Sequence, residues 1–179
     1  MPSASIVGWG KCLPPAVLTN DDLATFLDTS DEWIATRTGI RARRISHVPL
    51  AELAAVATKR ALACAGLEAR DAALIVSGPT TYDAQCPNQP SGLQRAIGAE
   101  GCGAMDVNTA CTSFLYGLSS ATAMIRTGVV RTAVVVGAEL ISPLMDRTNR
   151  DVAVLFADGA AAAVLQASEP GDGLQLEKL

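Results

Sequence analysis

Aromatic residues are scarce in this chain of 179 residues: two Trp, two Tyr and three Phe make up 4%. Hydrophobic residues nevertheless reach 49%, so the core must be built from Ala, Val, Leu and Ile. Charged residues are also few, at 18%, and this balance excludes a disordered or low-complexity chain. Acidic residues (18) outnumber basic ones (14). Because a nucleic-acid-binding protein of this size is usually basic, we expect no nucleic-acid partner.

No apolar run approaches the ~20 residues that cross a bilayer, so we expect no membrane partner. The N-terminus does not have the basic-then-apolar layout of a secretory signal. The five cysteines contain no CxxC pair and form a poor disulfide framework, which favours a reduced, cytoplasmic compartment. With one histidine, His47, we expect no structural zinc site, although a metal held by carboxylates alone stays open. The cysteines are Cys12, Cys64, Cys86, Cys102 and Cys111.

The hydrophobic pattern alternates between strand-like and helix-like segments, without repeats or linkers, and predicts an α/β layered fold. Expected strands cover 5–8, 72–77, 104–107, 132–137 and 152–156, followed by a turn at Asp158-Gly159 and a further apolar run to Leu165. Expected helices run from Thr19, an N-cap residue, through Leu27, from the N-cap Ser30 over Trp33, and over 51–65, 92–97 and 114–125. The last is apolar nearly all round, which predicts burial on every side.

The final residues, 173–179, alternate apolar and polar side chains like a strand. One interpretation is an edge strand at the end of a complete chain. The other is a strand whose partner lies in a longer protein. The pattern alone does not choose between them.

Cys111 is the first candidate for chemistry because it lies between an expected strand and an expected helix. Unpaired N–H groups and the positive end of the dipole at a helix N-terminus favour the thiolate, which is the nucleophilic form. The alternative is that Cys111 only packs, as buried cysteines usually do. We expect His47 to face solvent or pack in a loop, and not to assist Cys111.

The segment 28–43 is the second dense stretch. Trp33 and Arg37 are four residues apart and share a helix face. Together they can stack a flat ring and pair a phosphate. The alternative is a Trp packed in the core with a solvated Arg at its rim. Gly8-Trp9-Gly10 does not complete a dinucleotide-binding fingerprint.

Four ordered segments resemble the 3-oxoacyl-(acyl-carrier-protein) synthase III family, thiolase-fold condensing enzymes of fatty-acid synthesis. The run 28–34 with 37–41 resembles the family's N-terminal signature, and 106–114 resembles its nucleophile segment. Asn149-Arg150 and 155–165 resemble the next two landmarks. The resemblance implies one half of a thiolase-like fold, with a mixed β-sheet covered by helices and a buried central helix after the nucleophile.

The resemblance also implies a reaction and its residues. An acyl group passes from acyl-CoA to the cysteine, and condenses with malonyl-acyl carrier protein with release of carbon dioxide. Cys111 corresponds to the nucleophile, and its own N–H to an oxyanion-hole donor. Thr29, Trp33, Arg37 and Arg150 correspond to the positions that hold the adenine and phosphate end of coenzyme A. Coenzyme A is then a substrate, and no cofactor is implied.

Family members are about twice as long and consist of two similar halves. The resemblance therefore implies that 1–179 is the N-terminal half of a homodimeric enzyme. The catalytic His and Asn come from the second half and have no match here, so we expect no condensation activity from this chain. The surface for the missing half would be exposed and would favour association.

Two other functions remain. One is a starter or acyl-transfer synthase of secondary metabolism on the same fold. The other is a natural, non-catalytic half-length subunit. Whether the coding sequence continues past Leu179 distinguishes a natural half-length subunit from a fragment of a longer enzyme.

The chain departs from the family pattern at three places. The loop between Ser46 and Ala51 is shorter, and Thr112-Ser113 replaces smaller residues beside the nucleophile. Cys86 stands where a bulky aromatic from the partner subunit often closes the acyl pocket. A smaller side chain leaves a deeper pocket, and each extra buried methylene is worth about 0.8 kcal/mol. We therefore expect a primer longer than acetyl.

Overall fold

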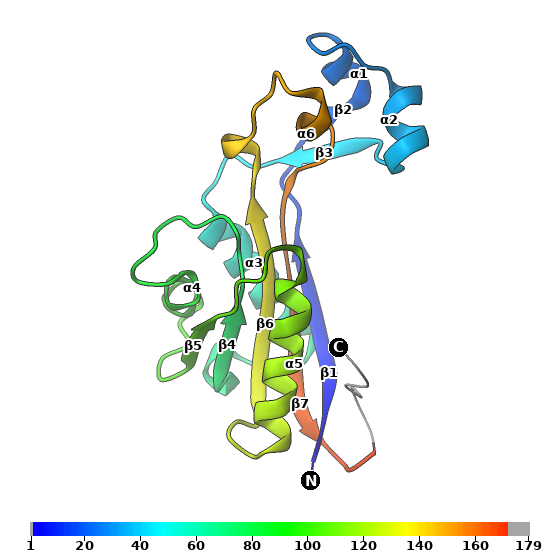
Figure 1. Cartoon of the computed structure of the whole chain (residues 1–179). Helices are drawn as coiled ribbons and strands as arrows, with labels where there is room; N and C mark the ends of the chain where they lie inside the picture. The colour runs from blue at the N-terminus through cyan, green and yellow to red at the C-terminus, as the bar shows by residue number, and fades with distance from the viewer. Residues whose placement is uncertain (1, 172–179) are drawn as a thin grey trace.

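The computed structural model describes residues 2–171, which form a twisted sheet covered by helices with a smaller cap at one end (Figure 1). The predicted strand at 173–179 lies outside the described residues. The strands are β1 (Ser3–Cys12), β2 (Ala16–Thr19), β3 (Ala42–Ile45), β4 (Leu74–Ser77), β5 (Gly103–Asp106), β6 (Thr132–Leu140) and β7 (Asp158–Ser168). The α-helices are α1 (Asn20–Ala24), α2 (Asp31–Thr38), α3 (Leu50–Cys64), α4 (Gln89–Ile97), α5 (Ser113–Arg126) and α6 (Arg150–Ala153).

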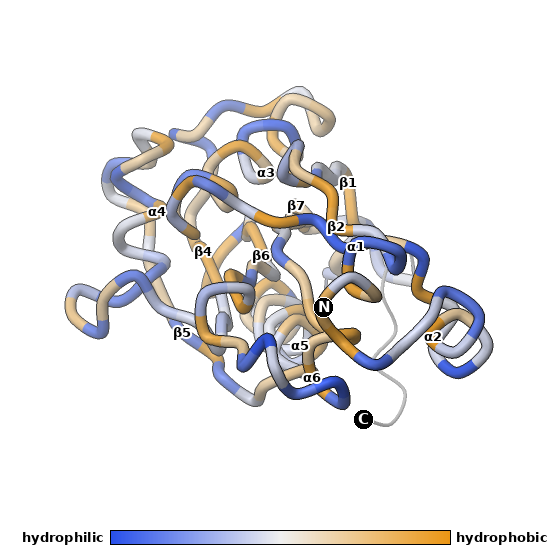
Figure 2. Tube along the Cα trace, turned by 90° about the horizontal axis from the view of Figure 1, so that it is seen from above, coloured by the Kyte–Doolittle hydropathy of each residue, from blue (hydrophilic) through white to orange (hydrophobic). Residues whose placement is uncertain are grey.

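The main sheet is mixed and has the strand order β1-β7-β6-β4-β5. β4 pairs parallel with β5 and β6, and β7 pairs antiparallel with β6 and β1. The central strands are continuous apolar runs because both of their faces are covered. Seen from above, β4 is orange in the middle of the molecule, whereas α2 at its edge is mainly blue and pale (Figure 2). This confirms the predicted α/β layers.

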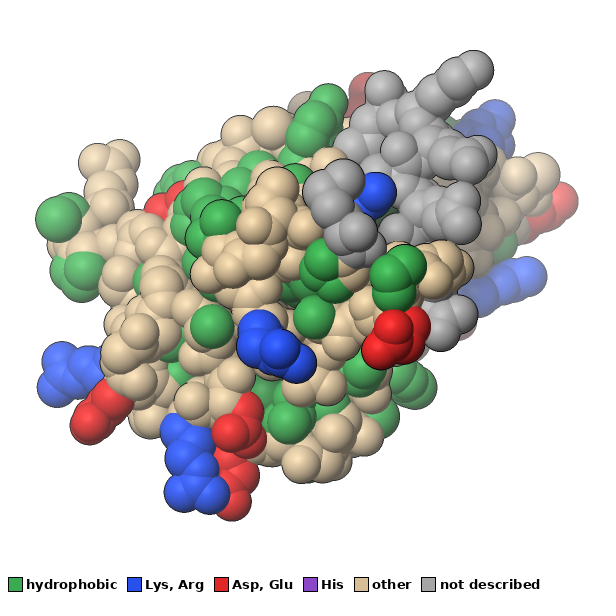
Figure 3. Space-filling model, turned by 90° about the horizontal axis from the view of Figure 1, so that it is seen from below, with side chains coloured by type: hydrophobic (Ala, Val, Ile, Leu, Met, Phe, Trp, Pro, Cys, Tyr) green, Lys and Arg blue, Asp and Glu red, His purple; other side chains and the backbone are tan. Residues whose placement is uncertain are grey.

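Helices cover both faces of the sheet and enclose two hydrophobic cores. α3 packs on β1, β7 and β6, and α5 packs on β6 and β4. The Gly8-Trp9-Gly10 run owes its glycines to α3: a Cβ on Gly8 or Gly10 would lie 2.5 or 2.4 Å from a carbonyl oxygen of that helix. Hydrophobic side chains are scattered over the end of the molecule opposite the cap, and charged ones sit mostly towards its rim (Figure 3).

A separate cap is formed by the two-stranded sheet β2-β3 together with α1, α2 and α6. Its small core contains Leu23, Ile34 and Val154. The N-caps predicted from sequence are confirmed, since the Thr19 and Ser30 side chains accept hydrogen bonds from the backbone N–H groups of Asp22 and Trp33. No helix of the described residues is long and apolar enough to cross a membrane.

Four sequence predictions about local structure are wrong. The expected strand at 152–156 is the end of α6 and a loop, because Asn149 caps the helix and only Val154 of the apolar run enters the cap core. Asp158-Gly159 begins β7 and is not a turn, since both residues pair with β6. The first helix ends at Ala24, before Leu27. α5 is not buried on every side, because Leu115 and Tyr116 are 52% and 46% exposed on the face away from the sheet.

Candidate active site

Cys111 lies in a 3-10 turn, Ala110–Thr112, that leads directly into α5. Its side chain is exposed. The N-cap residue of α5, Thr112, makes no side-chain capping hydrogen bond. Among the described residues, the Cys111 N–H donates to no backbone carbonyl in the turns and loops. Cys111 therefore lies two residues before the first residue of α5, at the positive end of the helix dipole, and no side-chain cap of Thr112 competes there.

The turn before the thiol is held by side chains. Ala110 has a φ of 54°, a left-handed conformation that is uncommon for a residue with a Cβ. Asn108 Oδ1 accepts a hydrogen bond from the Ala110 N–H at 3.1 Å, and Asn108 Nδ2 donates to the Tyr82 hydroxyl at 2.7 Å. Ser113 Oγ accepts from the Thr109 N–H and donates to the Ala110 carbonyl. The position of Cys111 is therefore fixed from both sides.

An open hollow of about 840 Å³ lies in front of Cys111. Small residues give it room, among them Gly137 and Ala160 on the sheet and Gly78 directly after β4, and Phe114 forms part of its wall. Lys11 and Glu139 are its charged members, and sequence analysis missed both. Only Glu139 leaves a signal in the sequence, as a carboxylate closing a Val-rich strand. Its carboxylate accepts hydrogen bonds from the Thr80 and Thr81 N–H groups and holds the loop after β4.

A second cluster forms around Trp33 on α2. The guanidinium carbon of Arg37 lies 4.5 Å from the centroid of the Trp33 ring, as expected for residues on one helix face. The guanidinium of Arg150, at the start of α6, lies 4.7 Å from the same centroid. Trp33 is half-buried and packs against the cap core, so it contributes to packing. Two cations also lie against its ring.

Thr29 directly precedes the N-cap of α2, and its hydroxyl is buried without a hydrogen-bond partner among the described residues. Arg150 Nη1 donates to the neighbouring Asp28 carbonyl at 2.9 Å. An open hollow of about 740 Å³ adjoins Arg150 and Asn149. The fold thus brings together Thr29, Trp33, Arg37 and Arg150 at the cap.

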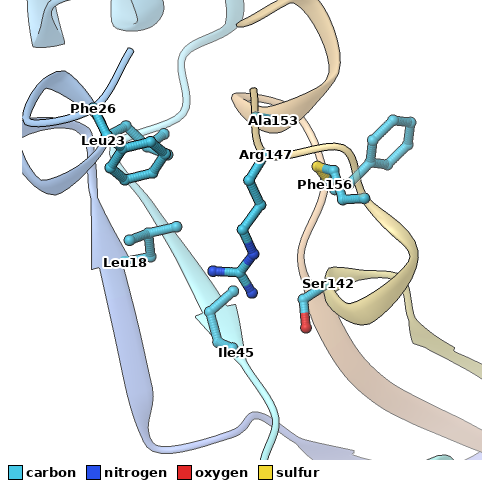
Figure 4. A pocket seen from close by; sticks show the side chains of 9 residues that line it. Leu18, Leu23, Phe26, Ile45, Ser142, Arg147, Ala153 and Phe156 are labelled. Carbon is cyan, nitrogen blue, oxygen red and sulfur yellow. The ribbon is translucent and has the colours of Figure 1, made fainter. Parts of the chain in front are cut away.

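A smaller and more enclosed hollow, of about 320 Å³, lies between the β2, α1 and β3 part of the cap and the segment 142–156, which includes α6. Arg147 points into it between Ile45 and Ser142, and Phe26 and Leu23 lie at its far side (Figure 4). Its lining is mostly apolar. Sequence analysis gave no indication of this hollow, because its residues come from five separate segments.

Cys86 lies on the exposed loop between β4 and α4. It is not among the described residues that line the hollow in front of Cys111. The same loop is anchored by Asp83, whose carboxylate accepts hydrogen bonds from the N–H groups of Leu50 and Ala51 at the start of α3. His47 is exposed in the loop before α3, as expected. No group of three or more His, Cys, Asp or Glu among residues 2–171 could hold a metal ion.

Comparisons with known proteins give one consistent family. The family model for 3-oxoacyl-[acyl-carrier-protein (ACP)] synthase III matches residues 105–177. A β-ketoacyl-[acyl-carrier-protein] synthase III 2 of Vibrio vulnificus is 54% identical over 98% of this chain and 49% of its own length. The β-ketoacyl-[acyl-carrier-protein] synthase III of Xanthomonas campestris pv. campestris is 48% identical over 92% of this chain and 51% of its own length. The chain spans about half the length of the curated relatives it matches.

Solved structures agree. The 3-oxoacyl-[acyl-carrier-protein] synthase III of Aquifex aeolicus superposes with a TM-score of 0.91 at 40% identity, covering 93% of this chain and 54% of that one. A priming β-ketosynthase of a polyketide biosynthetic pathway superposes with a TM-score of 0.90 at 32% identity, covering 93% and 51%. The fold is therefore that of these thiolase-like enzymes.

Proposed function

In sequence and in fold this chain is a relative of the 3-oxoacyl-[acyl-carrier-protein] synthase III enzymes, and on that premise we propose that it is the nucleophile-bearing, N-terminal half of a condensing enzyme. The observation that carries the proposal is the exposed Cys111 thiol before the uncapped N-terminus of α5, facing a hollow of about 840 Å³. This placement suits attack on a thioester carbonyl.

In the proposed step, the Cys111 thiolate attacks the carbonyl carbon of an acyl-CoA. The new carbon–sulfur bond forms first, and the negative charge moves to the carbonyl oxygen. The Cys111 N–H stabilises that oxyanion because it has no competing acceptor in the turn. The bond to the coenzyme A sulfur then breaks, and coenzyme A leaves as its thiolate, which takes a proton from water.

The coenzyme A end would bind at the cap. Trp33 offers an aromatic ring for the adenine, while Arg37 and Arg150 lie within 4.7 Å of its centroid and can pair phosphate oxygens. Thr29 adds a buried hydroxyl whose hydrogen bond is unused. In this proposal coenzyme A is a substrate, and the protein uses no resident cofactor.

Condensation would need more than this chain offers. The acyl group on Cys111 would react with malonyl-acyl carrier protein, with loss of carbon dioxide, in a cytoplasmic homodimer of the two-half enzyme. The supporting His and Asn have no match here, so this chain alone would not condense. The exposed Leu115 and Tyr116 on α5 are suited to packing against a second half. Cys86 would leave room for a primer longer than acetyl.

A starter synthase of secondary metabolism is the second candidate, supported by the superposition on the priming β-ketosynthase. It shares the loading of Cys111 and differs in the acceptor.

Intact denaturing mass spectrometry after incubation with octanoyl-CoA tests the loading step. We expect one added octanoyl group that disappears in Cys111→Ala. Cys64→Ala is the matched control, because Cys64 is also exposed but lies at the end of α3. An unmodified mass, or modification that survives Cys111→Ala, would contradict the proposal.

A further inference from the structure

Arg43 on β3 is buried to 2% exposure, although its neighbours Arg41 and Arg44 are exposed. Its Nε and Nη2 donate to the Val154 carbonyl at 3.0 and 2.5 Å, and its Nη1 donates to Asn20 Oδ1. Both partners are neutral. Burial accordingly lowers the pKa of the guanidinium. A buried cation without a carboxylate partner is costly, and an apolar residue of similar size could fill the space.

The contacts of Arg43 continue into α2. Asn20 is 1% exposed, and its Nδ2 donates to Asp31 Oδ1 at 2.7 Å and to the Ile40 carbonyl at 2.9 Å. Asp31 is the first residue of α2, the helix that carries Trp33. The Asn20 amide therefore connects Arg43 to the start of that helix.

The other end of the network reaches α6. Val154 is the C-cap residue of this short helix, whose first residue is Arg150. A hydrogen-bonded chain of Val154, Arg43, Asn20 and Asp31 thus joins the two elements that meet at the Trp33 ring. The apolar contacts of the cap core also join them, but apolar contacts are not directional and do not set a register. A guanidinium that donates two hydrogen bonds to one carbonyl does set the register of the two elements, because its donors have a fixed geometry.

We propose that Arg43 is a positioning residue for nucleotide binding: it fixes the distance between the Arg150 guanidinium and the Trp33 ring. This inference rests on the proposed function, in which that pair holds the adenine end of coenzyme A. Arg43 itself touches no ligand in this proposal. The exposed ion pair of Arg41 with Asp31, with side chains 71% and 42% exposed, cannot replace it, because exposed pairs contribute little.

The test uses the full chain with Trp9→Phe, so that Trp33 is the only tryptophan. Trp9 is 65% exposed on β1 and lies outside the cap. Arg43→Met removes all three donors at similar length, and Arg43→Lys keeps the charge but not the fork. Arg44→Met is the matched control, since Arg44 is exposed on the same strand. Calorimetry gives the Kd of coenzyme A, and Trp33 fluorescence reports on the ring's surroundings.

We expect Arg43→Met to raise the Kd about tenfold, the scale of one lost cation–ring contact. Arg43→Lys should recover only part of this loss, and Arg44→Met should match the parent. The emission of Trp33 without ligand should change in Arg43→Met as it does in Arg150→Ala. Combining Arg43→Met with Arg150→Ala should weaken binding no further than Arg150→Ala alone, because Arg43 acts through Arg150.

If Arg43 has only a structural role, Arg43→Met will lower the melting temperature and leave the Kd and the Trp33 emission unchanged, and this result would overturn the inference. Additive effects on the Kd in the double variant would overturn it as well. If the parent binds no coenzyme A, the proposed function fails, and the emission comparison still decides the positioning role. If Arg43→Met does not fold by circular dichroism, Asn20→Ala breaks the same network and must give the same emission change for the inference to stand.

Discussion

The guanidinium carbon of Arg150 lies 4.7 Å from the centroid of the Trp33 ring. The two residues come from α6 and α2, and Arg37 adds a second cation at 4.5 Å. In the proposed function these groups divide the work on coenzyme A, with the Trp33 ring contacting the flat adenine and the guanidinium groups pairing phosphate oxygens. Under that proposal the cap is a binding surface as well as a packing unit.

Trp33→Ala should weaken coenzyme A binding by about tenfold or more, because stacking of one base on an aromatic ring is worth about 1–3 kcal/mol. Calorimetric titration of the folded variant measures this. The control is Trp9→Ala, which removes an exposed tryptophan from β1. If Trp33→Ala lowers only the free energy of unfolding and leaves the Kd unchanged, the ring is a packing residue.

Tyr82→Phe should slow acylation of Cys111 about fivefold, since it removes a hydrogen bond worth about 1 kcal/mol that holds Asn108 and, through it, Ala110. Stopped-time mass spectrometry with octanoyl-CoA gives the rate. Tyr116→Phe on α5 is the control and should react at the parent rate. Equal rates for both variants would show that the nucleophile turn does not need Tyr82.

Cys86→Phe should shift acyl preference from octanoyl-CoA towards acetyl-CoA. Filling the space of each methylene removes about 0.8 kcal/mol, or about fourfold in rate per methylene. The measurement is the ratio of acylation rates with the two substrates, and Cys64→Phe is the control on another exposed cysteine. An unchanged ratio would place Cys86 outside the acyl pocket.

The local signals in the sequence were sufficient for much of the fold. Thr19 and Ser30 identify helix starts, because an N-cap depends on neighbours two or three residues away. Long-range contacts had no such signal. Arg43 reads as one solvated arginine among several, and only the pairing of β3 and the approach of Val154 bury it. Arg150 reaches Trp33 for the same reason, through the tertiary fold.

The run 152–156 shows why an apolar stretch can mislead. Val154 enters the cap core, whereas Leu155 and Phe156 are 44% and 38% exposed. Exposed and buried apolar residues look alike in the sequence. Hydrophobicity does not show whether another part of the fold will cover a given side chain. The same holds for α5, whose Leu115 and Tyr116 are exposed although the sequence predicted a helix buried on every side.

Asp106 gives a pH-dependent prediction. Burial raises the pKa of its carboxyl, and a hydrogen bond from Asn88 offsets only part of that effect. The folded protein therefore holds the proton up to higher pH than the unfolded chain, whose value is ~3.9. Stability should fall as pH rises from that value through the raised pKa.

Asp106→Asn should remove this loss, so that the variant gains stability over the parent between pH 4 and pH 7. Urea unfolding at both pH values measures the difference. Glu100→Gln, an exposed carboxylate, is the control and should show no such gain. A gain of equal size at pH 4 would mean that the charge of Asp106 is not the cause.

Gly78 should not tolerate a side chain. A Cβ there would lie 1.9 Å from the Val107 carbonyl oxygen and 2.6 Å from Ser113 Cβ. Gly78→Ala should cost about 3 kcal/mol or more, because backbone has to move between β4 and the nucleophile turn. Gly92→Ala on α4 has nothing within 4 Å and should gain about 0.5–1 kcal/mol. Urea unfolding compares them, and a mild Gly78→Ala would contradict the close approach.

The pairing of β1 with β7 has a consequence for biosynthesis. Within residues 2–171, β1 is an edge of the main sheet, and its one partner there, β7, ends at Ser168. A ribosome adds about 5–20 residues each second, so the first strand waits roughly 8 to 30 seconds for its partner to be made. During that time Ile6 and Trp9 lie on an open strand edge, a surface that a chaperone can hold. The emerging chain completes its sheet only when almost all of the described residues have left the tunnel.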